Sequence, residues 1–140
     1  MKINRILIIF VGMVIFLSTG CSMGIKNYGD KIVVEKQVDG WDKYEFYNEI
    51  RVAKEVKKAK NILQGVKWEN AKVNMAYPPE YKFHFEDSKS KTKGYDYSLW
   101  ISPNKDKIEL VVDNEAKYAQ LEKEESSSLF KIIIGKDLGN

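Results

Sequence analysis

The strongest constraint on the fold is a run of three segments in which apolar and polar residues alternate. Tyr81, Phe83 and Phe85 alternate with polar side chains, and the same period of two continues over 95–101 and 108–112. Such alternation is typical of antiparallel strands that bury one face and expose the other. The second half of the chain is therefore predicted to form an antiparallel meander.

Further strands are expected at 31–38, 44–50 and 117–121, and a short strand is possible within 67–77. The segment 44–50 also fits a helical stripe, but its aromatic residues favour a strand. Apolar residues at helical spacing predict helices over 53–64 and 123–134. Gly65 is expected at the C′ position of the first helix, and Gly135 is expected to stop the second.

These elements predict one α+β domain over residues 31–140. About five to six strands form an antiparallel sheet, and two helices cover one of its faces. Pairing the strands through their turns places three rows of side chains on the opposite face. The expected rows are Lys82/Trp100/Glu109, His84/Ser98/Val111 and Glu86/Asp96/Asp113.

The N-terminus has the layout of a secretory signal peptide. Lys2 and Arg5 precede an apolar run over 6–17, and the small or polar residues Ser18, Thr19 and Gly20 lead to Cys21. This order resembles a bacterial lipoprotein precursor. The resemblance implies that the Cys21 thiol takes a diacylglycerol and that cleavage before it removes residues 1–20. Residues 21–30 would then be the lipidated cysteine and a flexible tether.

Two other interpretations of the N-terminus remain. Residues 6–25 form an uncharged stretch of twenty residues, which is long enough to span a membrane as an uncleaved anchor. A soluble secreted form is the second alternative. All three interpretations place the domain outside the cytoplasm, and the lipoprotein places it on the outer face of a Gram-positive-type cell membrane.

The charge balance and the cysteine content exclude several classes of partner and site. Two of the 23 basic side chains lie in the predicted leader. The remaining 21 are almost balanced by 20 acidic side chains, so the chain after the leader is close to neutral. Export and near-neutral charge disfavour nucleic acid as a partner. Cys21 is the single cysteine, which excludes an intramolecular disulfide or a CxxC zinc site.

Three sequence blocks carry a resemblance to a known family. They are Lys67-Trp68-Glu69-Asn70, Trp100-Ile101-Ser102-Pro103, and the ending from Leu121 to Ile133 that contains Leu129-Phe130-Lys131. Together they resemble the YhfM-like lipoproteins of Bacillus over most of 40–135. The resemblance implies a surface lipoprotein with a small α+β domain, and it implies no activity.

Few residues in the chain suggest catalysis. His84, Ser98 and Asp96 are the residue types of nucleophilic catalysis, but a flat strand surface offers no oxyanion hole. An exposed sheet histidine is therefore expected. Glu86, Asp96 and Asp113 in one row would supply carboxylates for a hard cation such as Ca²⁺. Their spacing matches no calcium loop, so a solvated sheet end is expected and no metal or cofactor is predicted.

Two surface features suggest binding. Lys54, Lys57 and Lys58 share one helix face, which either binds anionic lipid or wall polymer or is an ordinary solvated face. Alternation puts Trp100 on the polar face, where it either anchors a partner or is covered by the segment 66–80.

The leading hypothesis is a lipoprotein with a non-enzymatic binding domain, attached to the membrane through its diacylglycerol. Its partner would be an envelope protein, a cell-wall polymer or a small ligand. The rival hypothesis is a small envelope hydrolase or metal-dependent enzyme that uses His84 with Glu86, Asp96 and Asp113.

Overall fold

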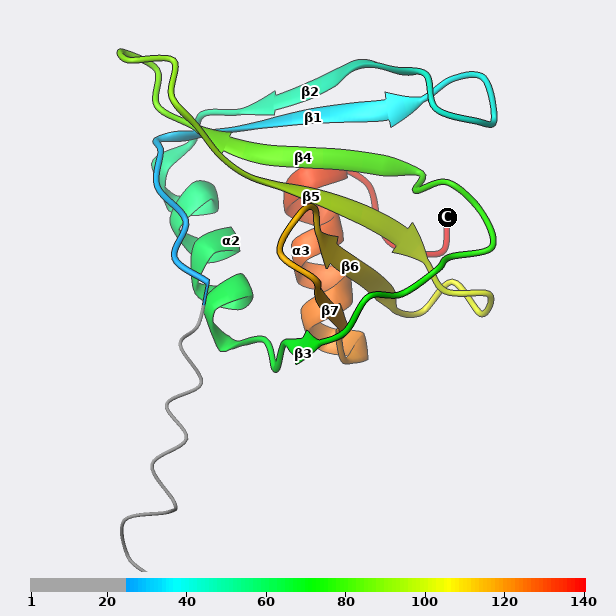
Figure 1. Cartoon of the computed structure of the whole chain (residues 1–140). Helices are drawn as coiled ribbons and strands as arrows, with labels where there is room; N and C mark the ends of the chain where they lie inside the picture. The colour runs from blue at the N-terminus through cyan, green and yellow to red at the C-terminus, as the bar shows by residue number, and fades with distance from the viewer. Residues whose placement is uncertain (1–24) are drawn as a thin grey trace, which may run out of the picture.

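The computed structural model describes residues 25–140, which form seven strands and two helices (Figure 1). The elements are β1 (Lys31–Gln37), β2 (Tyr44–Ile50), α2 (Ala53–Gly65), β3 (Glu69–Asn70), β4 (Tyr81–Glu86), β5 (Lys93–Ile101), β6 (Ile108–Val112), β7 (Lys117–Gln120) and α3 (Lys123–Ile134). The segment 44–50, which the sequence left between strand and helix, is strand β2.

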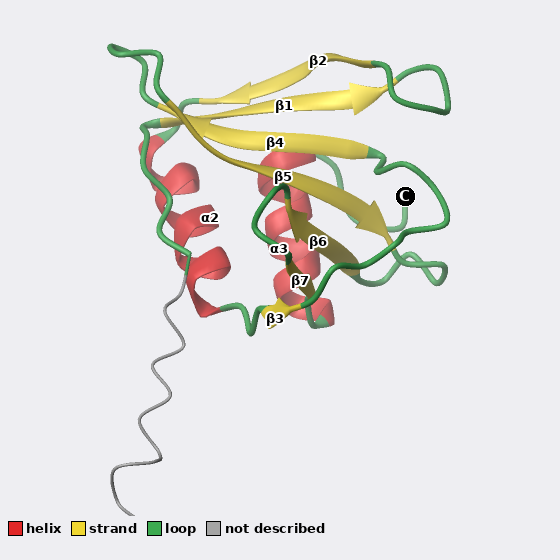
Figure 2. Ribbon diagram, in the orientation of Figure 1, coloured by secondary structure: helices red, strands yellow, loops and turns green. Residues whose placement is uncertain are grey.

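All seven strands join one sheet in the order β2-β1-β4-β5-β6-β7-β3, and every neighbouring pair is antiparallel. Both helices lie against the same face of this twisted sheet (Figure 2). The α+β class and the one-sided helical cover are confirmed. The expected five to six strands were too few, because Glu69 and Asn70 form a short edge strand opposite Tyr118 and Lys117 of β7.

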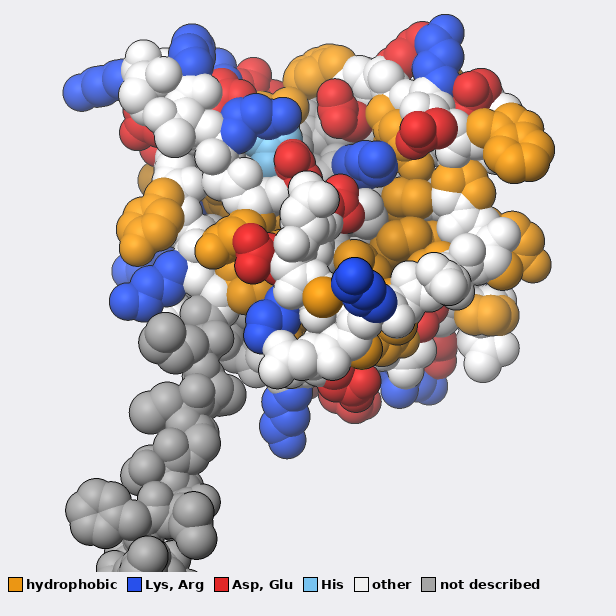
Figure 3. All heavy atoms as spheres, viewed as in Figure 1, with side chains coloured by type: hydrophobic (Ala, Val, Ile, Leu, Met, Phe, Trp, Pro, Cys, Tyr) orange, Lys and Arg blue, Asp and Glu red, His pale blue; other side chains and the backbone are white. Residues whose placement is uncertain are grey.

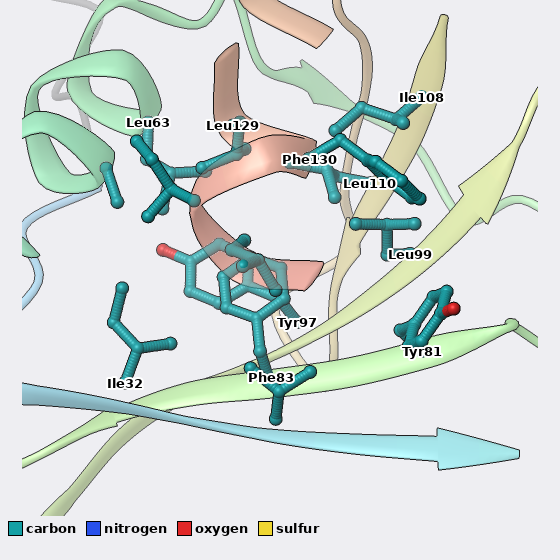
Figure 4. Close-up of a cluster of buried hydrophobic side chains, with 14 of the residues drawn as sticks. Ile32, Leu63, Tyr81, Phe83, Tyr97, Leu99, Ile108, Leu110, Leu129 and Phe130 are labelled. Carbon is teal, nitrogen blue, oxygen red and sulfur yellow. The ribbon is translucent and has the colours of Figure 1, made fainter. Parts of the chain in front are cut away.

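The core fills the space between the helices and the sheet (Figure 4). At its centre the rings of Phe83 and Tyr97 stack with centroids 4.7 Å apart and planes 5° from parallel. The Tyr97 side chain is fully buried, and its hydroxyl donates to Asn27 Oδ1 at 2.7 Å. This hydrogen bond fastens the segment that precedes β1 to the middle of the sheet.

Each helix buries the stripe that its sequence predicts. Helix α2 turns Val56, Ala59 and Leu63 inward, and Lys54, Lys57 and Lys58 face solvent. Within residues 25–140, neither helix is long and apolar enough to cross a membrane. Gly135 ends α3 in the left-handed region at φ 77°, as expected. The placement of Gly65 was wrong, because it is the last residue of α2 and the chain becomes extended at Val66.

The pairing of β5 with β6 follows the expected rows, whereas the pairing of β5 with β4 does not. Trp100 lies opposite Glu109 and Ser98 opposite Val111, as predicted. Between β4 and β5 the prediction was wrong by two residues, since Lys82 pairs with Ser98 and His84 with Asp96. The cause is a longer β5. It begins at Lys93, so the hairpin closes over 87–92 and the partners of Lys82 and His84 move by two positions. An irregularity between His84 and Glu86 moves the partner of Glu86 by three.

Candidate functional site

The face of the sheet that the helices leave open carries a chain of alternating charges, here called the ionic network (Figure 3). It crosses strands β2, β1, β4 and β5 and ends at an arginine just after β2. Its members are Arg51, Glu49, Lys31, Glu86, His84, Asp96 and Lys93.

Lys31 is the centre of the network. Its Nζ lies 2.9 Å from Glu49 Oε1 and 2.9 Å from Glu86 Oε1, and its side chain is only 7% exposed. The hydrogen bond that Lys31 donates to Glu86, followed by the one that it donates to Glu49, raises the pKa of Lys31. Reciprocally, the Lys31 ammonium is the main cause that lowers the pKa of each carboxyl. All three groups are therefore charged across the physiological range.

His84 was expected to be exposed, and this expectation was wrong. It is only 5% exposed. Its Nε2 lies 3.4 Å from Glu86 Oε2, and its Nδ1 lies 3.7 Å from Asp96 Oδ1. A neutral imidazole carries one N–H and can donate to only one of these carboxylates. The other ring nitrogen is then free to accept a proton.

Ser98 is not presented to the histidine as a nucleophile. Its side chain is buried, and its hydroxyl donates to Asp113 Oδ1 at 2.9 Å. Burial raises the pKa of Asp113, and the Ser98 hydroxyl partly opposes that shift. A serine held by a carboxylate in this way lacks the nitrogen base that would activate it.

The predicted row of three carboxylates does not form. The shift in register places Lys93, rather than Asp96, opposite Glu86. Asp96 and Asp113 remain neighbours, since the Asp113 amide donates to the Asp96 carbonyl at 2.8 Å. Among residues 25–140, no three side chains of the metal-ligating types come together to hold an ion.

A second feature of the open face is an aromatic patch at the end where β1 finishes. It consists of Trp41, Tyr44, Phe46, Tyr77 and Trp100, which lie in or beside the ends of β1, β2, β4 and β5 that strand pairing brings together. Tyr44 donates its hydroxyl to the Pro79 carbonyl at 2.8 Å, and Trp100 Nε1 donates to the Tyr77 carbonyl at 2.8 Å. These bonds draw the segment 77–79 against the strands. Trp100 is thus half-buried, in contact with the segment expected to cover it.

Three members of the aromatic patch are far more exposed than aromatic side chains usually are. The exposed fractions are 79% for Trp41, 68% for Phe46 and 77% for Tyr77. Sequence reasoning did not select them. The bulge at Val34/Glu35 lets Tyr47 pack on Tyr81 in the core and turns Phe46 outward, which a strict alternation cannot show. A usable signal was the turn around Gly40, which exposes the neighbouring Trp41.

The predicted lysines lie on the other side of the molecule. Lys54 and Lys58 line a groove of about 500 Å³ between α2 and α3, together with Lys131 and Asp137. Lys57 lines a separate hollow beside residues 25–28. The structure thus separates these lysines from His84 and Trp100. The predicted lipid-attachment residue Cys21 and the cleavage residues Ser18, Thr19 and Gly20 lie outside the described residues.

A crystal structure of a thioesterase-like protein from Clostridium sporogenes is similar to this domain. The TM-score is 0.52 at 13% sequence identity, over 76% of this chain and 95% of that one. At this identity the likeness shows the fold alone. The expectation that the domain is not an enzyme is contradicted, because this fold is also that of a thioesterase-like protein.

The search of curated proteins found no match. The profile described as "YhfM protein" matches residues 25–138, which span nearly the whole described domain. The family resemblance drawn from the sequence blocks is thereby confirmed, whereas the lipoprotein assignment stays a prediction. The chain belongs to the YhfM protein family.

Proposed function

We propose that this protein is a lipoprotein on the outer face of the cell membrane, attached through diacylglycerol on Cys21. The order of basic, apolar and small residues before that cysteine supports the proposal. Two acyl chains hold a protein on a bilayer where one gives only reversible attachment. Cells fed a clickable fatty-acid analogue should label the protein, and Cys21→Ser should abolish the label. A label that persists in Cys21→Ser would refute the anchor.

The anchored domain binds a component of the envelope, a wall polymer or a protein, through the aromatic patch. The observation that carries this is the exposure of Trp41, Phe46 and Tyr77 at one end of the open face. Leaving large aromatic rings in water is unfavourable, and a clustered exposed patch of this kind marks an interaction surface. Aromatic side chains also dominate the binding energy at such surfaces.

The test uses the triple variant Trp41→Ala/Phe46→Ala/Tyr77→Ala of the full chain. Because all three side chains are exposed, the variant should keep the melting temperature of the parent. It should lose co-sedimentation with purified cell walls or, for a protein partner, photo-crosslinking in intact cells. The matched control is Tyr28→Ala/Tyr95→Ala, which removes exposed rings elsewhere on the molecule. Equal binding by the parent and the triple variant in both assays would exclude the patch.

A second function, hydrolysis of a thioester or ester, is favoured by the surroundings of His84. If Nε2 donates to Glu86 Oε2, 3.4 Å away, Nδ1 can take a proton from an attacking water as a general base does, and Asp96, 3.7 Å from Nδ1, stabilises the imidazolium that forms. The structural neighbour is described as thioesterase-like, which suggests an acyl thioester as the first substrate to try. His84→Gln and Asp96→Asn should then each reduce turnover of a model acyl thioester at unchanged folding. Hydrolysis that survives both substitutions would exclude this site.

A further inference from the structure

We infer that the domain docks on anionic lipid headgroups through the surface around Ile25. This inference rests on the lipid anchor proposed above. This anchor-side surface consists of Lys26, Tyr28, Lys57, Lys60, Tyr95 and Lys117. It lies where the described chain begins, beside α2 (Figure 1).

The covalent chain places this surface close to the bilayer. Ile25 follows Cys21 by four residues, and a fully extended chain of that length spans at most about 14 Å. The screening length at physiological ionic strength is about 8 Å, which is of the same order. Charges around Ile25 therefore lie within reach of the membrane surface potential.

The segment 27–30, which leads from the N-terminal side into β1, is fixed to the fold. Tyr97 holds Asn27 through its hydroxyl, and Lys60 Nζ donates to the Gly29 carbonyl. The Asp30 amide donates to the Glu86 carbonyl at 3.1 Å. Because this segment is bound at Asn27, Gly29 and Asp30, an anchor at Cys21 favours the side of the domain around Ile25 as the one that meets the lipid.

The charge of this side complements anionic lipid. The residues around the hollow of about 250 Å³ beside Ile25 include Lys26, Lys57 and Lys60 and no acid. A larger hollow of about 660 Å³ on the other side of the segment adds Lys117, with Glu115 as its one acid. Lys26 and Lys57 make no ion pair within residues 25–140, so their charge is available to a partner.

Two tyrosines complete the resemblance to a membrane-facing surface. Tyr28 and Tyr95 both line the larger hollow and are exposed, at 74% and 40%. Tyrosine side chains are enriched at the level of lipid headgroups, because the ring is apolar and the hydroxyl is polar. With this side on the bilayer, β1 runs away from the anchor, and the aromatic patch at its far end faces the wall.

The experiment measures lysine acetylation rates by mass spectrometry on the full lipidated protein. The protein is compared in detergent, on phosphatidylcholine vesicles and on vesicles that also contain phosphatidylglycerol. On the anionic vesicles, acetylation of Lys26 and Lys57 should slow several-fold, whereas Lys43 and Lys105 should react as in detergent. Neutral vesicles should protect much less. In Lys26→Glu/Lys57→Glu the protection of Lys60 and Lys117 should fall, and the matched charge change Lys43→Glu/Lys105→Glu should preserve it.

The acylated protein could float with the vesicles while all its lysines are acetylated at the rates found in detergent. That result would overturn the docking and leave the lipid anchor intact. Equal protection on neutral and anionic vesicles would overturn the role of charge. An intact mass without acyl groups would overturn the anchor and the docking together.

Discussion

The Lys31 ammonium lies 2.9 Å from the carboxylate of Glu86, its cross-strand partner on β4, and at the same distance from Glu49 on β2. One cation thus joins three strands at the end of the sheet where β1 begins. Because the Lys31 side chain is almost fully buried, its replacement would remove the shared counter-charge between Glu49 and Glu86 and leave Glu49 paired only with the largely exposed Arg51.

Lys31→Met is expected to lower the melting temperature clearly, since it removes the ammonium but keeps the aliphatic stem. The control is Lys43→Met, which removes an exposed lysine 3.5 Å from Glu45 and should leave stability almost unchanged. Thermal unfolding by circular dichroism measures both. Equal melting temperatures for the two variants would show that the Lys31 cluster does not stabilise the fold.

The same cluster predicts how stability changes with pH. Lys31 holds the pKa of Glu49 and Glu86 below 4.5 in the folded state, so folding favours their ionised forms. Their contribution is complete above pH 4.5 and is lost as the pH falls through the lowered values. The raised pKa of Lys31 means that its contribution is lost only as the pH rises beyond 10.5.

Burial of Asp113 raises the pKa of that carboxyl, so protonation of Asp113 in acid favours the folded state. This effect on stability is opposite to that of Glu49 and Glu86. The measurement is therefore the difference in melting temperature between the parent and Lys31→Met from pH 3 to pH 7. This difference should shrink as the pH falls below 4.5. A difference that stays constant over the whole range would contradict the assignment.

Ser126 predicts a second stability effect, at the junction of α3 with the sheet. Its Oγ accepts from the Ile108 amide at 3.0 Å and donates to the Leu121 carbonyl at 3.1 Å, and the side chain is fully buried. Ser126→Ala leaves the Ile108 amide without a partner, which should cost about 1–3 kcal/mol of unfolding free energy. Denaturant unfolding of Ser127→Ala, one residue on and exposed, should show no loss. A loss of the same size in both variants would contradict this account.

Gly29 predicts an effect of backbone geometry. Its φ of 122° suits glycine, and a Cβ placed there would lie 2.7 Å from the Glu86 backbone. Gly29→Ala should therefore displace the segment 25–30 from β4. Gly40→Ala is the matched control, because φ is 78° and the space around it is open. It should cost only about 1–2 kcal/mol for the left-handed backbone. Amide hydrogen exchange over 25–30 should rise in Gly29→Ala alone, and equal exchange would contradict the clash.

The polar and apolar alternation of Tyr81 to Glu86 was sufficient to predict β4 and its buried face, because the side-chain period of a strand is two. It was not sufficient for the partners across β5. Whether His84 faces Ser98 or Asp96 depends on where the 87–92 turn closes, and turn residues alone allow several lengths. Phe46 was missed for a related reason, since a bulge in β1 and β2 interrupts the alternation.

The local pattern of the chain determined the antiparallel strands, the two amphipathic helices and the α+β class, since these depend on spacing within a few residues. The family resemblance likewise came from short blocks such as Lys67-Trp68-Glu69-Asn70. Tertiary structure decided the strand order, the burial of His84 between two carboxylates, and the meeting of Trp100 with Tyr77. Those features depend on contacts between distant segments, whose geometry follows from packing and turn closure rather than from any one stretch of sequence.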